Sequence, residues 1–228
     1  MGEPQVEQGA RTSSDERPGA RPPGLAGRLM RQFSGPQGVL GHVAGYLMAR
    51  MNRELNTWII ELLAVQQDDR VVDIGCGPGL AVEMAASRAT RGFVAGVDRS
   101  EVMVGQARRR NAMAVRTGRV DVRCAPAALL PYPDGSFTKA CVVNSLQFWP
   151  SIGDGVREIH RVLRPGGVLV VALRMRAEDA GQYDRRRFGL SEQRIAEIID
   201  VLRVTGLTVA SQRREVRGEM ITALVARK

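Results

Sequence analysis

The sequence predicts an α/β fold built on a doubly wound, mostly parallel sheet of seven strands. From residue 70 onward, short and nearly continuous apolar runs alternate with amphipathic segments. This alternation is typical of strands buried on both faces and of the helices that cover them. The run 71–79, Val-Val-Asp-Ile-Gly-Cys-Gly-Pro-Gly, places a strand, a tight turn and a helix start in succession. Open α/β sheets build their ligand crevices in that order.

Five parallel strands and three helices are expected to alternate through the first part of this region. Each predicted strand is a short run rich in valine, isoleucine, leucine or alanine. The strands are expected at 70–74, 93–97, 120–124, 140–143 and 167–173. The helices are expected at 80–89, 101–114 and 152–163. An Arg-Pro-Gly-Gly sequence after the last helix is a stop signal.

The C-terminal part of the chain is expected to close the sheet with an antiparallel hairpin. Residues 174–190 are polar and predict a surface loop or a short helix. Ser191 has the position of an N-cap for a helix that Gly206 ends. Two short apolar strands, 207–209 and 220–225, then bracket an arginine-rich segment, which is the pattern of a hairpin.

Two segments precede the sheet. Residues 1–30 are rich in Gly, Pro, Arg, Ser and Glu, and we expect a disordered tail because they cannot bury enough apolar surface to offset chain entropy. Residues 31–66 repeat apolar side chains every three or four positions. That spacing predicts N-terminal helices, which could form a lid over a pocket or pack on the core. His42 and Tyr46 are polar residues in this segment, and in a lid their side chains would face the pocket.

Charge and composition exclude some functions. The net charge is +9, but only Lys139 and Lys228 among the 33 basic residues are lysines, and no basic stripe is interleaved with aromatic residues. A nucleic-acid partner is therefore not favoured. No apolar run approaches the length of about 18 residues that a membrane span needs, and no secretory signal is expected. The scattered Cys76, Cys124 and Cys141 match no zinc spacing and suit a reducing cytoplasm.

Four motifs occur in order along the chain. They are Val-Asp-Ile-Gly-Cys-Gly-Pro-Gly at 72–79, Gly-Val-Asp at 96–98, Leu-Pro-Tyr-Pro-Asp-Gly-Ser-Phe at 130–137 and Arg-Glu-Ile-His-Arg-Val-Leu-Arg-Pro-Gly-Gly at 157–167. Together they resemble the class I S-adenosylmethionine-dependent methyltransferases, in the branch that acts largely on small molecules. The resemblance implies a Rossmann-like fold, a methyltransferase domain at 67–228 that binds S-adenosylmethionine, and a small-molecule substrate.

The glycine motif is expected to bind the methionine end of this cofactor. Dinucleotide sites usually contain the sequence G-x-G-x-x-G, and the N-terminus of the helix that follows binds the pyrophosphate. Leu80 replaces the third glycine here, which suits a cofactor without phosphate. The resemblance assigns the ammonium of the cofactor to Asp73 and to the Gly75 carbonyl. The turn that Gly77 and Gly79 keep open, with Cys76 inside it, completes this part of the site.

The nucleoside end is assigned to the next strand ends. By resemblance Asp98 takes both ribose hydroxyls, because a carboxylate can accept two hydrogen bonds. Arg99 and Met103 are placed beside the adenine, although Met103 could instead be a core residue. Family members often carry an aspartate that accepts from the adenine amino group, and this chain has Ala-Pro-Ala at 125–127. Adenine recognition would therefore depend on backbone groups around Ala127 and Ala128.

The fourth strand ends in Asn144, where cofactor and substrate should meet. Gln147 and Trp149 could contact either one, or Trp149 could pack the strand-to-helix turn. The Asn/Asp-Pro-Pro-Tyr sequence of adenine-N6 methyltransferases is absent, and so is the acidic pair of a magnesium-dependent catechol enzyme. We therefore expect no metal.

Methyl transfer from a sulfonium needs alignment more than covalent help. A general base matters only for a hydroxyl or a protonated amine, and His42 is the better candidate because His160 lies in a structural motif. The arginine run 185–187 could face a carboxylate or phosphate on the substrate, or be solvated. Two other functions stay open: methylation of RNA or protein, which the positive charge motivates, and a non-catalytic domain that binds the cofactor as a regulatory partner.

Overall fold

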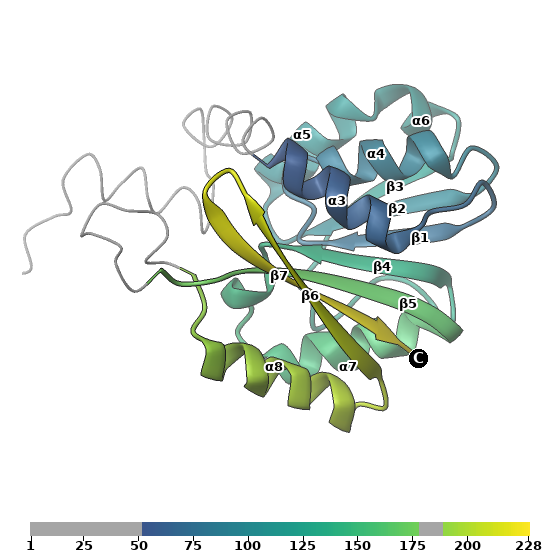
Figure 1. Cartoon of the computed structure of the whole chain (residues 1–228). Helices are drawn as coiled ribbons and strands as arrows, with labels where there is room; N and C mark the ends of the chain where they lie inside the picture. The colour runs from purple at the N-terminus through teal and green to yellow at the C-terminus, as the bar shows by residue number, and fades with distance from the viewer. Residues whose placement is uncertain (1–51, 178–188) are drawn as a thin grey trace, which may run out of the picture.

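The computed structural model describes residues 52–177 and 189–228. The predictions for the tail 1–30, for helices before residue 52, for His42 and Tyr46 and for the arginine run 185–187 lie outside the described residues. Figure 1 shows one sheet with helices packed on both of its faces. None of the helices in the described ranges has the length and hydropathy that crossing a bilayer requires.

Seven strands form one sheet in the order β3-β2-β1-β4-β5-β7-β6. They are β1 (Arg70–Ile74), β2 (Phe93–Asp98), β3 (Val120–Cys124), β4 (Phe137–Val143), β5 (Leu163–Arg174), β6 (Thr208–Val216) and β7 (Glu219–Arg227). Strands β1 to β5 are parallel, and β7 pairs antiparallel with both β5 and β6. The predicted doubly wound sheet and its closing hairpin are confirmed. The strand order changes direction between β1 and β4, because β2 and β3 follow on one side of β1 and β4 and β5 on the other. Doubly wound sheets bind ligands at this position.

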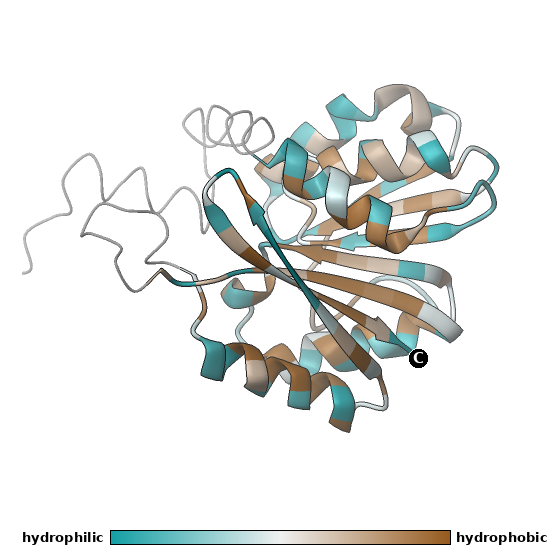
Figure 2. Cartoon of the chain, in the orientation of Figure 1, coloured by the Kyte–Doolittle hydropathy of each residue, from teal (hydrophilic) through white to brown (hydrophobic). Residues whose placement is uncertain are grey.

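Helices cover the two faces of the sheet. Figure 1 shows α3 (Arg53–Leu63), α4 (Leu80–Arg88), α5 (Glu101–Arg110) and α6 (Ala112–Arg116) on one side, and α7 (Ile152–Val162) and α8 (Glu192–Val204) on the other. Successive residues of a strand belong to two different hydrophobic clusters. Val71 belongs to the same cluster as Leu55, and Val72 belongs to the same cluster as Ile159. The central strands are therefore apolar on both faces, and Figure 2 shows them mostly in the brown of hydrophobic residues.

The helix that we expected at 101–114 is two helices, so that prediction is wrong. Helix α5 ends at Arg110 and α6 begins at Ala112. The Asn111 side chain between them donates from Nδ2 to the Ala107 carbonyl at 2.9 Å and to the Gly79 carbonyl at 3.2 Å. An asparagine amide that bonds to nearby backbone carbonyls favours a helix end. The bond to Gly79 also links the end of α5 to residues 75–79, which we call the glycine loop.

The strands of the second half are longer than predicted. Strand β4 begins at Phe137, and β5 begins at Leu163, before the Arg-Pro-Gly-Gly sequence that ends α7. That sequence forms an irregularity in β5, because the pairing shifts from Phe137 with Leu163 to Lys139 with Val168. A stop signal for a helix therefore does not exclude a strand immediately after it.

The hairpin turn is tighter than the predicted arginine-rich segment. Strand β6 continues to Val216, so Arg213 and Arg214 are strand residues. The turn is made by Arg217 and Gly218, whose φ angles are 53° and 75°. Two positive φ angles define the type I′ turn that suits the twist of a hairpin. The tip of the hairpin therefore lies at the same edge of the sheet as the carboxyl end of β5.

Candidate functional site

The glycine loop wraps over the end of β2. The amides of Gly75 and Cys76 both donate to the Val97 carbonyl, at 2.7 and 3.0 Å. Gly79 has a φ of 79°, and a Cβ there would lie 2.7 Å from Ala107 Cβ on α5. Only glycine allows this close approach of loop and helix. The loop is therefore fixed by hydrogen bonds to β2 and by close packing against α5.

Ser145, in the turn after β4, contacts the same loop. Its hydroxyl donates to the Ile74 carbonyl at 2.8 Å. A Cβ at Gly75 would lie 2.3 Å from Ser145 Cβ, and Gly75 has a φ of 75°. We did not anticipate Ser145 from the sequence, because its contact depends on how β1 and β4 are paired.

The Gly75→Ala variant is expected to lose about 2–5 kcal/mol of unfolding free energy in a urea titration. A left-handed φ costs a residue with a Cβ about 1–2 kcal/mol, and the overlap with Ser145 adds an overpacking cost of about 1–3 kcal/mol. Gly118→Ala is the matched control, because Gly118 has a φ of 72° and no neighbour within 4 Å of a Cβ. It should show the conformational cost alone. Equal losses in the two variants would contradict the steric role of Ser145.

Asp98 anchors the end of β2 and faces the glycine loop. Its Oδ2 accepts from the Gly77 amide at 2.9 Å, and its Oδ1 accepts from the Ser100 amide at 2.9 Å. Burial raises the pKa of this carboxyl, and backbone hydrogen bonds from Ser100, Gly77 and Arg99 partly offset that rise. A carboxylate accepts through both oxygens, so its acceptor capacity suits hydroxyl donors. Asp98 could therefore hold a diol.

Asp73 lies at the end of β1 and is only 3% exposed. Burial is the main reason that its pKa is raised to about 7, and the charge of Asp98 adds to the rise, whereas a hydrogen bond from Cys141 lowers it. Its Oδ1 is a buried polar atom that no donor among the described residues reaches. A buried carboxylate oxygen is costly unless it meets a donor or a cation.

A second group of buried polar atoms follows β4. Asn144 has a φ of 52°, and both Oδ1 and Nδ2 of its side chain are buried without a partner among the described residues. Gln147, in the short helix η1 (Leu146–Phe148), donates from Nε2 to the Asn144 carbonyl at 3.1 Å, while its Oε1 is also buried and unpaired within the described ranges. The neighbouring strands β1 and β4 therefore both end with buried polar atoms that have no partner among the described residues.

The remaining candidates lie around this centre. Met103 is 2% exposed at the start of α5, and Arg99 is on the exposed side of the turn before it. Ala127 and Ala128 lie in the turn after β3. The indole of Trp149 packs on α7, where a Cβ at Gly155 would be 2.4 Å from its ring. This contact favours packing as the role of Trp149.

The residues present fit S-adenosylmethionine. Asp73 Oδ1 can accept from an ammonium, the amides of Asn144 and Gln147 can bond to polar groups, and Asp98 can accept from two hydroxyls. No group of three His, Cys, Asp or Glu side chains in the described residues could hold a metal ion. A doubly wound sheet of seven strands with a closing hairpin, a G-x-G-x-G turn and two strand-end carboxylates defines the class I methyltransferases that use S-adenosylmethionine.

The chain belongs to this family. The family model described as a methyltransferase domain matches residues 72–171. The chain is 31% identical over 147 residues to the uncharacterized methyltransferase YdaC of Bacillus subtilis. The alignment covers 64% of this chain and 79% of that protein. It is 39% identical over 111 residues to the 27-O-demethylrifamycin SV methyltransferase of Amycolatopsis mediterranei, covering 48% of this chain and 40% of that enzyme. The chain therefore matches less than half of the rifamycin enzyme.

Solved structures share the fold. A SAM-dependent methyltransferase from Aquifex aeolicus superposes with a TM-score of 0.63 at 17% identity, covering 89% of this chain and 97% of that one. At this identity the likeness shows the fold alone. The methyl donor of the family, S-adenosylmethionine, is the cofactor of this chain.

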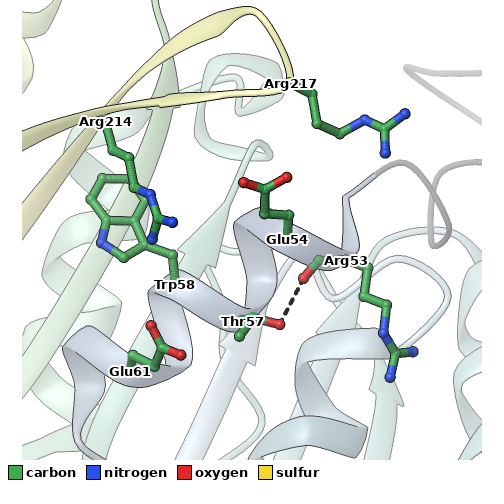
Figure 3. A pocket seen from close by; sticks show the side chains of 7 residues that line it. All are labelled: Arg53, Glu54, Thr57, Trp58, Glu61, Arg214 and Arg217. Carbon is green, nitrogen blue, oxygen red and sulfur yellow. Dashed lines mark hydrogen bonds between the residues drawn. The ribbon is translucent and has the colours of Figure 1, made fainter.

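One large groove lies away from the glycine loop. It has a volume of about 500 Å³ and runs between α3 and the β6–β7 hairpin. Figure 3 shows Arg214 over the ring of Trp58, with Glu54 and Glu61 one helical turn to either side. The guanidinium lies 5.8 Å from the ring centre. Arg214 covers this aromatic face, and three arginines and two glutamates are spread along the groove, so its formal charge of +1 is not gathered at one point.

Proposed function

We propose that the chain transfers the methyl group of S-adenosylmethionine to a small organic acceptor, without a metal ion. The observation that carries this proposal is the set of buried polar atoms at the switch point, which belong to Asp73, Asn144 and Gln147. They lie where the reacting end of a cofactor would meet an acceptor. The rifamycin relative acts on a small molecule, as its name states, and this supports the acceptor class.

Each residue has a role in holding the donor. The cofactor supplies an activated methyl group on its sulfonium. Asp73 accepts from the ammonium together with the Gly75 carbonyl, and Asp98 accepts from both ribose hydroxyls. Met103 lies against the adenine, whose polar edge meets the backbone around Ala127 and Ala128. The chain accelerates transfer by aligning the acceptor and excluding water.

The N-terminal segment completes the proposal. The described part of residues 31–66 packs on the sheet as α3, with Leu55, Ile59 and Leu63 buried. The proposed lid, with His42 and Tyr46, therefore precedes α3 and lies outside the described residues. His42 removes a proton when the acceptor is a hydroxyl or a protonated amine. We place the protein in the cytoplasm, because Cys76, Cys124 and Cys141 are free thiols and suit a reducing compartment.

Two measurements test this function. Isothermal titration calorimetry should show that S-adenosylmethionine and S-adenosylhomocysteine bind, and heat from neither would discard the proposal. Labelled S-adenosylmethionine incubated with the protein and a cell extract should then transfer its methyl group into the low-molecular-weight fraction. Label in RNA or protein instead would identify a macromolecular acceptor, and binding without any transfer would identify a regulatory domain.

A further inference from the structure

A second, smaller cavity lies on the carboxyl edge of the sheet. It has a volume of about 190 Å³ and is lined by the side chains of Asn52, Leu55, Arg174, Val216, Arg217, Glu219 and Ile221. Arg174 ends β5, and the Asn144 amide donates to the Ala172 carbonyl of that strand at 3.2 Å. The cavity is therefore on the same edge as the candidate cofactor site. The register aligns Asp73 with Val170 of β5, so Arg174 lies two strands across and four residues further along, roughly 16 Å from Asp73.

An ion pair forms one wall of this cavity. Arg174 Nε lies 2.9 Å from Glu219 Oε2, and the two side chains are 17% and 20% exposed. Removing charges from water is expensive, so a pair of this kind is weak evidence for stability. Its location beside a cavity at the ligand-binding edge indicates a binding role.

Polar and apolar groups share the rest of the wall. Asn52 precedes α3, but its side chain makes no capping hydrogen bond to that helix. Arg217 lines the cavity from the hairpin turn, and Figure 3 shows its side chain leaving the hairpin tip beside the first turn of α3. Leu55, Val216 and Ile221 supply apolar contacts. Polar and charged side chains therefore outnumber apolar ones in this lining, which suits a charged group of a ligand better than an apolar one.

We infer that this cavity binds a carboxylate group of the methyl acceptor, with Arg174 as the residue that selects it. The inference rests on the proposed function and narrows its substrate to anionic small molecules. Two arginines and one glutamate give the cavity a formal charge of +1, which suits a monoanion better than a phosphate. The planar guanidinium can pair with a carboxylate through two hydrogen bonds.

The size of the cavity sets which part of the acceptor enters. At about 30 Å³ for each water, its volume equals roughly six waters. This is room for a carboxylate and a short stem, so the rest of the acceptor extends toward the end of β4. On this account Glu219 holds Arg174 in place and also competes with the ligand for it. Neutralising Glu219 should therefore tighten carboxylate binding, whereas a purely structural ion pair would not respond in this way.

Benzoate and benzamide are matched probes for the cavity, because they differ in charge but hardly in shape. Ligand-observed NMR titrations would measure the binding of each to the full chain, with and without S-adenosylhomocysteine. We expect benzoate to bind at least about tenfold more tightly than benzamide. Arg174→Gln should weaken benzoate by about tenfold or more, and Glu219→Gln should tighten it severalfold. Arg213→Gln is the control, because Arg213 pairs with Glu192 at 2.6 Å, outside the cavity, and should leave benzoate binding unchanged.

Several results would overturn the inference. The wild-type protein would fail to bind benzoate, it would bind benzoate and benzamide equally, or the Arg174→Gln variant would bind benzoate as tightly as the wild-type protein. If Arg174→Gln fails to fold, Glu219→Gln decides, and unchanged or weaker benzoate binding in that variant would refute the role of the ion pair. Failure of the wild-type protein to bind S-adenosylhomocysteine would instead refute the proposed function, because benzoate binding is measured independently of it.

Discussion

Replacing Asp98 with alanine is expected to weaken the binding of S-adenosylhomocysteine by about 10- to 100-fold in isothermal titration calorimetry. The variant loses the charge-assisted hydrogen bonds to the ribose hydroxyls, whose contribution of about 1.5–3 kcal/mol gives a change of this size. It also loses the acceptor for the Gly77 amide, which is 2.9 Å away, so the glycine loop is held less firmly. Both effects act in the same direction.

Asp121→Ala provides a matched control for this variant. Asp121 lies on β3, the strand next to β2, and its Oδ2 contacts Arg123 Nε at 2.5 Å and the Tyr132 hydroxyl at 3.2 Å. It has no proposed contact with the cofactor, so the affinity should match that of the wild-type protein. Unchanged affinity in Asp98→Ala would show that the ribose is bound elsewhere. Equal losses in both variants would mean that the loss reflects a general disturbance of the sheet edge.

The sequence was most informative where local chemistry dictates structure. Val71 and Val72 are apolar because both faces of β1 are covered, and this continuity predicted a parallel strand. Ser191 was recognised as an N-cap, and its hydroxyl does accept from the Arg194 amide at 3.2 Å. Asp73 and Asp98 stand out in the sequence because Asp98 ends β2 and Asp73 lies one residue before the end of β1, just ahead of Gly75. These features depend on a few neighbouring residues.

Features that depend on pairing between distant strands could not be predicted. The parallel register sets Asp73 beside Cys141, and only then does that thiol become a donor to the carboxylate. The same alignment places Ser145 under Gly75. Asn111 ends α5 because the Gly79 carbonyl is within reach of its amide. A shift of one residue between strands would exchange the faces of every side chain, and no local pattern specifies such contacts.

Asp73 is expected to make cofactor binding depend on pH. Its pKa is about 7 in the free protein, chiefly because of burial. The ammonium of the cofactor favours the ionised carboxylate, so binding below that pKa must release a proton. Affinity for S-adenosylhomocysteine should therefore rise about tenfold between about pH 6 and about pH 8 and then level off. Calorimetry in buffers with different ionisation heats would measure both the affinity and the number of protons released.

The Asp73→Asn variant should separate binding from stability. An aspartate whose pKa rises from 3.8 to about 7 on folding reduces the stability of the free protein as the pH rises through that interval. The asparagine variant should therefore be more stable than the wild-type protein at about pH 8, by up to about 4 kcal/mol in a urea titration. It should bind the cofactor more weakly there, because the negative charge that meets the ammonium is gone. Most of the pH dependence of binding should also disappear, and Asp98, whose pKa burial also raises, contributes the remainder.

Asp121→Asn is the control for these measurements and should retain the wild-type stability, affinity and pH profile. A loss of stability in Asp73→Asn at about pH 8 would show that the Asp73 carboxylate is satisfied within the free protein. An unchanged pH profile would show that another group titrates. Higher stability together with weaker binding is the combination expected of a buried charge that is kept for a cationic ligand, because such a charge is unfavourable until the ligand neutralises it.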